Sequence, residues 1–315
     1  AYRGSPVKLN TLLTFPENSI MNQAKNAQYQ PGCRYQNKRI AEKRNCRVNA
    51  DGFGVAWYTT VETDVESCVF RSTMPSWGDV NLAELSNHVE SPSVFAHVRA
   101  MTSPGIDPVV GSVSIQNCHP FKWKSFTFMH NGGIQYFSRI KRKLQSLVYD
   151  EFYDIIAGST DSENIFALFL SILRRNVMSG TSRVPNPIFS GGKRRKKPYP
   201  TIDTKLEFRK LSKAEQAERD EQRKEWTKRM MAADPREIAT ALSDTIQAIV
   251  NIITEYSSCS ACSLNLAVTN GTAMVATRFR RGKSEPPSLY FAILKQIQGC
   301  NGKMKIWAQH DDIHP

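Results

Sequence analysis

The segment MHNGGI, residues 129–134, carries the most information about this chain. It overlaps an apolar run, Thr127–His130, whose composition predicts a β-strand that ends at His130. Just after a strand, the side-chain amide of Asn131 and the backbone N–H of Gly132 can together hold an oxyanion. Glycine permits the close approach and unusual backbone angles that such a site needs. Asn-Gly is also the pair most typical of a tight turn, so both interpretations stand at this point.

An arginine, Arg99, follows a second apolar strand candidate, Ser93–Val98, upstream of this segment. A guanidinium group at a strand end can hold a carboxylate through two parallel hydrogen bonds. A structural salt bridge is the alternative, and this stretch alone favours neither.

Downstream, Asp161 begins a predicted helix over Asp161–Leu173, because the apolar residues Ile165, Leu168, Phe169 and Ile172 recur on one face. Asp161 or Thr160 can cap the first turn of this helix. An acid there is usually a cap or a partner of the helix dipole. The alternative is that its carboxylate pairs with a substrate ammonium group.

The histidines of this region do not indicate a metal site. His97, His119 and His130 are irregularly spaced, and no cluster of cysteines or carboxylates accompanies them. The CxxC pattern at 259–262 has no second copy and is interpreted as an incidental pair in a loop. Residues 51–54 open a strand without the lysine and helix of a phosphate-binding loop. We therefore predict neither a metal nor a cofactor.

Composition limits the class of protein. A chain of 315 residues with 40% hydrophobic residues can build one large domain or two small ones. No apolar run reaches the roughly 18 residues that span a membrane. Seven cysteines, an odd number, favour reduced thiols and a cytoplasmic location over a disulfide framework.

The basic charge is concentrated in one segment. Residues 190–236 hold 15 Lys and Arg against 8 Asp and Glu, so they contribute +7 of the formal net charge of +13. We interpret residues 180–235 as a basic, flexible, solvent-exposed insertion that is partly helical. A nuclear signal or a nucleic-acid patch at KRRKK is the alternative, and the exposed insertion, with no nucleic-acid partner, is the interpretation we adopt.

The remaining pattern predicts a mixed structure. Further strand candidates are Gly54–Thr59 and Ser67–Ser72. The segments His119-Pro120-Phe121 and Lys122–Phe128 are interpreted as a turn leading into a strand. Further helices are predicted over Phe137–Val148 and Ile238–Ile253. A hairpin is predicted in which Ser263–Thr269 and Thr272–Arg278 flank Asn270-Gly271 as a two-residue type I′ turn.

Taken together and in order, several segments resemble the class II glutamine amidotransferases of the N-terminal-nucleophile hydrolase superfamily, and most closely their fungal glutathione-degrading members. The segments are AYRGSP, NADGFGVAWY, FRSTMPSWGDVNL, FAHVRAMTS, NCHPF, FMHNGGIQYF, KRKL, GSTDSENIFALFL, LNLAVTNGTAMVATRF and EPPSLYF. They cover roughly residues 1–175 and 237–291. The resemblance implies a four-layer αββα sandwich of two antiparallel sheets, an α+β fold. The expected domain is 1–291, interrupted at about 180–235, with an atypical tail at 292–315.

The resemblance also implies roles for individual residues. Asn131 and Gly132 would form the oxyanion hole, Arg99 would bind the substrate α-carboxylate, and Asp161 its α-ammonium. His130 and Thr102 would line or shape the pocket, and the loop beside the nucleophile would hold Asn49, Asp51 and Gly52.

The nucleophile of the family is an N-terminal cysteine. The family opening, Met-Cys-Arg-Phe-Leu, runs into the segment that here begins at Ala1, so the cysteine is expected upstream of Ala1. Its own α-amino group, with an ordinary pKa near 8, would serve as the base. None of the seven cysteines present can replace it, and the chain from Ala1 onward is expected to be inactive.

The resemblance implies hydrolysis of a γ-glutamyl amide bond, in glutathione or glutamine, within glutathione catabolism. It also implies a complex with a metallopeptidase-like subunit, and no membrane partner is expected. The alternatives are a catalytically dead assembly subunit and a nucleic-acid-binding protein.

Overall fold

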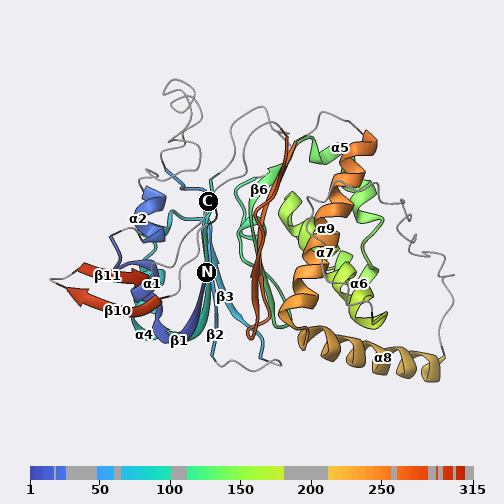
Figure 1. Ribbon diagram of the computed structural model, residues 1–315, viewed down its shortest axis with the longest axis horizontal. Coiled ribbons are helices and arrows are strands. Elements are labelled where there is room, and N and C mark those ends of the chain that lie inside the picture. The colour runs from blue at the N-terminus through green and yellow to red at the C-terminus, as the bar shows by residue number, and fades with distance from the viewer. Residues whose placement is uncertain are drawn as a thin grey trace.

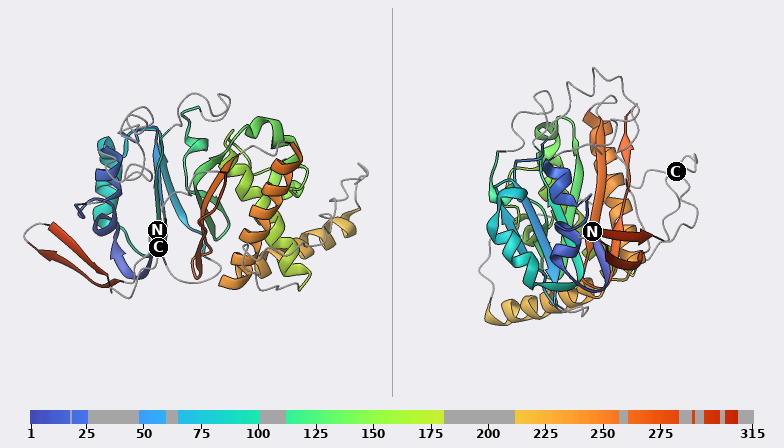
Figure 2. Two further views of the ribbon diagram at one scale, coloured as in Figure 1. Left: turned by 45° about the horizontal axis from the view of Figure 1, so that its top comes forward. Right: turned by 90° about the vertical axis from the view of Figure 1, so that its left-hand side faces the viewer.

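The computed structural model describes residues 1–17, 19–25, 48–59, 65–100, 112–180, 212–256, 261–282 and 289, together with two strands near the C-terminus. Two antiparallel sheets face each other, and helices cover the outer face of each (Figure 1). Figure 2 shows the same layers from two other directions. The predicted four-layer αββα sandwich is therefore confirmed.

The first sheet has the strand order β1-β4-β2-β3, with every neighbouring pair antiparallel. Its strands are β1 (Tyr2–Lys8), β2 (Phe53–Tyr58), β3 (Cys68–Ser72) and β4 (Glu90–Val98). Its outer face is covered by α1 (Leu9–Leu13), α2 (Ile20–Lys25) and α4 (Val80–His88), with the short η1 (Ser76–Gly78) beside them. A small apolar core, which includes Leu9, Phe53 and Leu82, fills the space between this sheet and its helices.

The second sheet has the order β5-β6-β7-β8, and β9 also pairs with β7. Its strands are β5 (Phe121–Trp123), β6 (Phe126–Ile134), β7 (Cys262–Thr269), β8 (Met274–Ala276) and β9 (Arg280–Arg281). Its helices are α5 (Phe137–Gln145), α6 (Asp150–Tyr153), α7 (Asp161–Met178), α8 (Lys213–Met231) and α9 (Pro235–Tyr256), with η2 (Ile115–Asn117) preceding β5. Most of the buried apolar side chains lie between this sheet and these helices.

Strand β6 is longer than predicted. The sequence pattern placed its end at His130, but residues 127–134 all pair with β7, from Thr127 opposite Thr269 to Ile134 opposite Cys262. Asn-Gly-Gly has a poor intrinsic preference for a strand, and the neighbouring strand overrides it. The strand predicted over Lys122–Phe128 is divided, because β5 and β6 form a hairpin whose turn is Lys124-Ser125.

Alternation along β6 assigns a face to each of its side chains. Phe128 stacks on Phe166 of α7, whereas Thr127 contacts Tyr58 of the first sheet. Met129 also packs against the first sheet, with Ala56 and Phe95. Because neighbours on a strand point to opposite faces, His130 faces the helices and Asn131 faces the space between the sheets.

A buried polar network joins the two sheets. The hydroxyl of Tyr58 donates to Ser125 O at 2.5 Å and lies 2.8 Å from Thr127 Oγ1. Thr127 in turn donates to Ser67 Oγ at 3.0 Å. Burial raises the pKa of Tyr58 to about 12, so the phenol stays protonated and holds β2 against β6.

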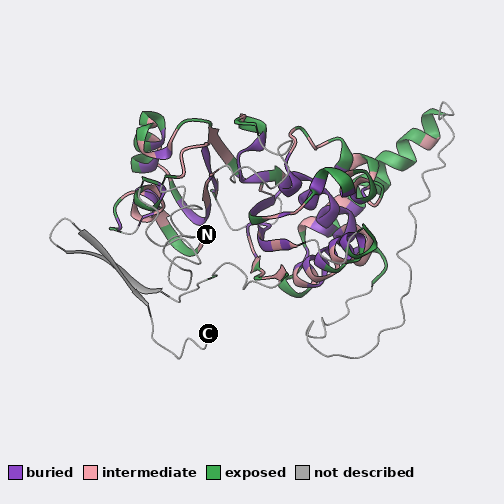
Figure 3. Ribbon diagram, turned by 90° about the horizontal axis from the view of Figure 1, so that it is seen from above, coloured by how far each residue is buried: buried purple, intermediate pink, exposed green. Residues whose placement is uncertain are grey.

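Helix α8 corrects the interpretation of residues 180–235 as one exposed insertion. Trp226 and Met230 of α8 are buried at 5% and 0% exposure. The Trp226 ring stacks on Trp123 at 6.0 Å and meets Phe152 edge-on. The rest of α8 projects into solvent (Figure 3). The segment from 212 to 235 is therefore part of the folded domain, and residues 181–211, which include KRRKK, lie outside the described residues.

The predicted hairpin forms, but its turn differs. Thr269 pairs with Met274, so residues 270–273 connect the strands in place of a two-residue type I′ turn. Asn270 is fully buried and its side-chain oxygen accepts from Ala273 N at 2.8 Å. Its amide donates to Met231 O and Ala233 O, both at 3.0 Å. Asn270 thus acts through its side chain, which donates hydrogen bonds to backbone carbonyl groups at the C-terminal end of α8.

Near the C-terminus, β10 (Leu294–Cys300) and β11 (Lys303–Ala308) pair only with each other and join neither sheet. None of the helices in the described part of the chain has the length and apolar character needed to cross a lipid bilayer.

Candidate active site

The ends of β4 and β6 meet between the two sheets. His97 of β4 lies beside the backbone of His130 in β6. Because Phe95 faces the second sheet, alternation places His97 and Arg99 on that same side. Arg99 and Asn131, which the sequence separates by more than 30 residues, therefore approach the same inter-sheet space.

Asn131 and Gly132 lie in the part of β6 that the sequence pattern did not extend to. Asn131 is exposed and lies directly opposite Asn265 of β7. Gly132 has a positive φ of 151°, and a Cβ at this position would collide with the Ser263 carbonyl oxygen. Glycine is therefore required at 132 for both backbone conformation and space.

The Arg99 backbone holds the loop that the resemblance places beside the nucleophile. Arg99 N donates to Gly52 O at 2.8 Å, and Asp51 N donates to Arg99 O at 3.1 Å. Gly52 has a φ of 102°, and a Cβ there would lie 2.6 Å from Cys118 Sγ. Asn49, the third residue predicted in this loop, is held by a different element, because its backbone nitrogen donates to Ala24 O at 2.7 Å near the end of α2.

The Arg99 side chain is 8% exposed. Its guanidinium Nη1 donates to the carbonyl oxygen of Ser112 at 3.2 Å. The backbone thus helps to orient the guanidinium, which suits a group that must meet a carboxylate in a fixed geometry.

Asp161, 7% exposed, is the first residue of α7 and lies beside the end of β6. Its Oδ2 accepts from Ile134 N at 2.8 Å, and Ser162 Oγ can donate to its Oδ1 at 3.2 Å. The helix cap is a different residue, because Thr160 Oγ1 accepts from Glu163 N at 3.3 Å. The alternative of Asp161 as the helix cap is therefore removed, and its carboxylate is anchored to the end of β6.

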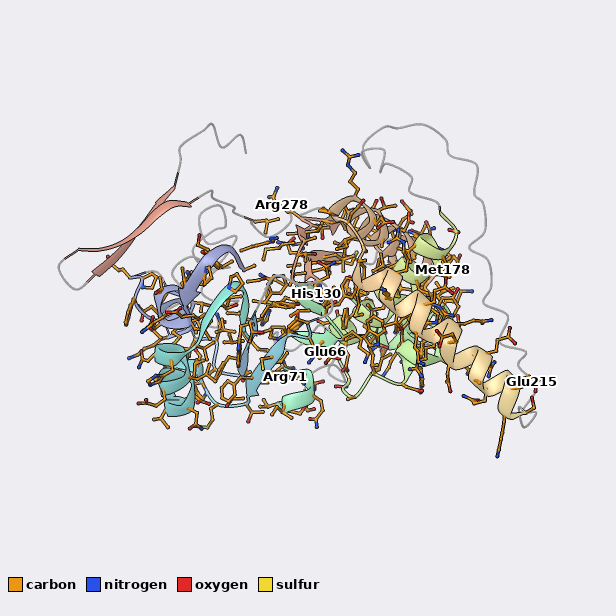
Figure 4. All side chains as sticks on the ribbon, turned by 90° about the horizontal axis from the view of Figure 1, so that it is seen from below. Glu66, Arg71, His130, Met178, Glu215 and Arg278 are labelled. Atoms are coloured by element: carbon orange, nitrogen blue, oxygen red, sulfur yellow. The ribbon has the colours of Figure 1, made fainter. Side chains whose placement is uncertain are left out.

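His130 is buried on the helix side of β6, at the centre of the molecule (Figure 4). Its Nε2 lies 2.9 Å from Ser263 O, which can only accept, so Nε2 carries a proton. Its Nδ1 lies 2.9 Å from Ser162 Oγ. His130 therefore connects β6, β7 and α7 and supports the strand beneath Asn131. Thr102, the other predicted pocket residue, lies outside the described residues.

Two histidines beside Arg99 are held neutral. The rings of His97 and His119 lie 4.3 Å apart. Burial lowers the pKa of His97 to about 4, and the nearby positive charge of Arg99 acts in the same direction. Burial also lowers the pKa of His119 well below its ordinary value. Arg99 is thus the cationic side chain among these three at neutral pH.

Sequence reasoning missed the residue that connects Arg99 to the start of α7. Asn117, 1% exposed, donates to Ser112 O at 2.9 Å and accepts from Ser159 N at 2.9 Å. It stands in the quoted NCHPF motif, but its role depends on partners in two other segments. Within the described residues, no group of three or more His, Cys, Asp or Glu side chains is arranged to hold a metal ion.

The chain is similar to known proteins in sequence and in structure. The family described as glutamine amidotransferases class-II matches residues 29–186, which is half of the chain. A relative from Saccharomyces cerevisiae, Probable glutamine amidotransferase DUG3, is 43% identical over 171 residues, which are 53% of this chain and 43% of the relative. The chain therefore spans less than half of that relative's length.

Among solved structures, a glutamine aminotransferase class-II domain protein from Silicibacter pomeroyi is similar. The two are 22% identical, with a TM-score of 0.44 over 75% of this chain and 72% of that one.

Proposed function

This chain belongs to the class II glutamine amidotransferases, and from that membership and its site we propose that it hydrolyses a γ-glutamyl amide bond in glutathione or glutamine. Both substrates carry a γ-glutamyl group with a free α-carboxylate and a free α-ammonium. One pocket can recognise this shared end in either molecule. The two substrates differ in the leaving group, which is ammonia for glutamine and cysteinylglycine for glutathione.

In this proposal Arg99 binds the α-carboxylate and Asp161 binds the α-ammonium. Both side chains are more than nine-tenths buried, so their charges act in surroundings with little water. Each is also oriented by a backbone group, Ser112 O for the guanidinium and Ile134 N for the carboxylate. Oriented, partly desolvated charges of opposite sign suit the two ends of an α-amino acid.

The nucleophile is proposed to be the cysteine that precedes Ala1 in the family opening. The register of β1 carries this proposal, because Tyr2 lies opposite Val94 and Arg3 lies opposite Ser93. Each residue further upstream matches one residue closer to Arg99. If the register continues, the fourth residue before Ala1 lies opposite Arg99, and in Met-Cys-Arg-Phe-Leu that residue is the cysteine.

The reaction follows from these positions. The thiolate attacks the γ-carbonyl carbon, and the α-amino group of the same cysteine takes the thiol proton. Asn131 and Gly132 donate to the oxyanion of the tetrahedral intermediate. The C–N bond then breaks, the departing amine takes a proton, and a γ-glutamyl thioester remains. Water attacks the thioester, releasing glutamate and restoring the thiol.

The test is an assay of the native protein whose N-terminus has been verified by intact mass. Release of glutamate from glutathione or glutamine, lost when the N-terminal cysteine is changed to alanine, is the expected result. A protein with a verified N-terminal cysteine that releases no glutamate from either substrate overturns the proposal. A native chain with no such cysteine leaves the assembly-subunit interpretation in its place.

We also propose that the protein acts in the cytoplasm with a metallopeptidase-like subunit, as the fungal resemblance implies. Co-purification of the tagged native protein with a metallopeptidase-like chain, and glutathione hydrolysis that rises when that chain is added, are the expected observations. Full activity of the isolated protein, with no such chain bound, contradicts the partner.

A further inference from the structure

Asn117 uses its side-chain amide to join two segments that lie far apart in the sequence. Its Nδ2 donates to Ser112 O at 2.9 Å and approaches Ser159 Oγ at 3.3 Å. Its Oδ1 accepts from Ser159 N at 2.9 Å. The side chain is 1% exposed, so these bonds are not exchanged for bonds to water.

The hydrogen bonds of the Asn117 amide to Ser112 and Ser159 are called the bridge below. At Ser112, the bridge is connected to Arg99. The Ser112 carbonyl oxygen that accepts from Asn117 also accepts from Arg99 Nη1 at 3.2 Å. A carbonyl oxygen has two lone pairs, and here each serves one of these donors. The position of the Arg99 guanidinium is therefore tied to that of Asn117.

On the other side, the bridge leads to Asp161. Ser159 is followed by Thr160, the cap of α7, and then by Asp161. The same turn is fixed by Glu163, whose carboxylate accepts from Gly158 N at 2.6 Å and from Ala157 N at 3.1 Å. The residues at the start of α7 are thus bonded to one another, and Asn117 is bonded to them at Ser159.

The turn has no spare room against Asn117. A Cβ at Gly158 would collide with Asn117 Oδ1 and would lie 3.0 Å from Glu163 Oε2. A side chain at 158 must therefore displace either the Asn117 amide or the turn that precedes Asp161. The bridge is a close contact as well as a set of hydrogen bonds.

We propose that Asn117 is a positioning residue that sets the separation between the carboxylate site at Arg99 and the ammonium site at Asp161. The inference rests on the proposed function. The expected effect differs between ligands. A ligand that carries both the α-carboxylate and the α-ammonium must match the separation of the two sites, whereas a ligand that carries only one of these groups occupies one site and does not depend on the separation.

Three competitors of glutamine hydrolysis separate these cases. L-Glutamate carries both the α-carboxylate and the α-ammonium, glutarate lacks the ammonium, and 4-aminobutanoate lacks the α-carboxylate. Inhibition constants are measured for the native protein and for Asn117→Ala and Asn117→Asp. Alanine removes the bridge without adding charge, while aspartate keeps the acceptor for Ser159 N and loses the donor to Ser112 O.

The expected result is a rise of about 10- to 100-fold in the inhibition constant of L-glutamate, the scale that a misplacement of about 1 Å produces. The constants for glutarate and 4-aminobutanoate should change little. Gly158→Ala should reproduce the same selectivity, because it displaces the bridge while leaving Asn117, Arg99 and Asp161 chemically unchanged. This second variant keeps the test open if both Asn117 variants fold poorly.

Asn176→Ala is the matched control. Asn176 is a part-buried asparagine in the last turn of α7, and its amide donates to Asp244 Oδ2 at 2.9 Å, away from Arg99 and Asp161. It should leave all three constants unchanged. Equal losses for the three competitors in the Asn117 and Gly158 variants would show a general structural role and overturn the inference. A native protein that hydrolyses no γ-glutamyl substrate would instead overturn the proposed function on which the inference rests.

Discussion

The carboxylate of Asp161 accepts a hydrogen bond at 2.8 Å from the backbone nitrogen of Ile134, the last residue of β6. This bond joins the first residue of α7 to the strand that carries Asn131 and Gly132. The candidate ammonium site and the candidate oxyanion site are therefore parts of one rigid connection. A change at Asp161 can act through charge or through this connection, and the two can be separated.

Asp161→Asn should separate them. The amide oxygen can still accept from Ile134 N, but the negative charge is lost. We expect kcat/KM for glutamine to fall by about 10- to 100-fold, as the loss of a charge-assisted hydrogen bond implies. Thermal unfolding should change little. Asp154→Asn, at an exposed aspartate, is the control, and comparable kinetics in the two variants would argue against the ammonium role.

Arg99→Lys should keep the charge and lose the planar fork. Lysine cannot both donate to Ser112 O and present two parallel donors to a carboxylate. We expect a loss of activity on γ-glutamyl substrates of about 100-fold, with little loss of stability. Steady-state kinetics and a melting curve measure the two effects. Arg142→Lys on the exposed face of α5 should be silent, and native-like kinetics in Arg99→Lys would remove the carboxylate role.

Tyr58→Phe should weaken the contact between the two sheets. It removes the hydroxyl that bonds Ser125 O and Thr127 Oγ1 and leaves those buried groups short of a partner. We expect unfolding free energy to fall by about 1–3 kcal/mol, measured by chemical denaturation. Tyr153→Phe, at a tyrosine 50% exposed, provides the comparison, and an equal effect in both would contradict the network.

Stability should fall as the solution is acidified. The folded-state pKa of His97 is about 4 against an ordinary 6.5, so between these values the unfolded chain binds more protons. The contribution of His97 to stability is therefore fully present above pH 6.5 and is lost as the pH falls towards 4, by about 3 kcal/mol. His119 acts in the same direction.

Denaturation midpoints between pH 7 and pH 4, at constant ionic strength, measure this dependence. His97→Gln should make the curve flatter, whereas His88→Gln, at an exposed histidine, should leave its slope unchanged. A slope that is the same in His97→Gln as in the native protein would assign the acid sensitivity to other groups.

Trp226→Ala should detach α8. The indole is 5% exposed and stacks on Trp123, and Arg174 lies over it at 4.4 Å. We expect a loss of about 3–5 kcal/mol, the usual cost of emptying such a site in a core. Glu225→Ala, on the exposed side of α8, should cost far less. A similarly small loss of stability in both variants would contradict the packing of α8 and support its interpretation as an exposed insertion.

Local patterns predicted the elements whose signals lie within a few residues. The apolar stripes of α7 and α9 gave their helices, and strand-like runs located β2, β3 and β4. Trp226 and Met230 of α8 also follow helical spacing, but charged residues surround them and conceal one buried stripe. The end of β6 was hidden for another reason, because Asn-Gly-Gly becomes a strand only through its pairing with β7.

The types of residue in the candidate site could be proposed from the sequence, whereas the hydrogen bonds that hold them could not. Motifs predicted Asn131, Gly132, Arg99 and Asp161 as site residues, and their roles stay predictions. The structure shows strand pairing for Asn131 and Gly132 and a hydrogen bond to the backbone for Arg99 and for Asp161. Asn117 was missed because its partners, Ser112 and Ser159, lie in separate segments, the second of them 42 residues away. No spacing rule covers a side chain that bonds the backbones of two loops.

The closure of α8 by Asn270 has a consequence for synthesis on the ribosome. The carbonyl groups of Met231 and Ala233 receive their donors from a side chain 39 and 37 residues later in the chain. During synthesis, α8 can form, but the carbonyl groups of Met231 and Ala233 lack the Asn270 amide as a donor until Asn270 leaves the exit tunnel. A nascent chain arrested before that point should expose α8 to a protease, and one arrested well after it should protect it.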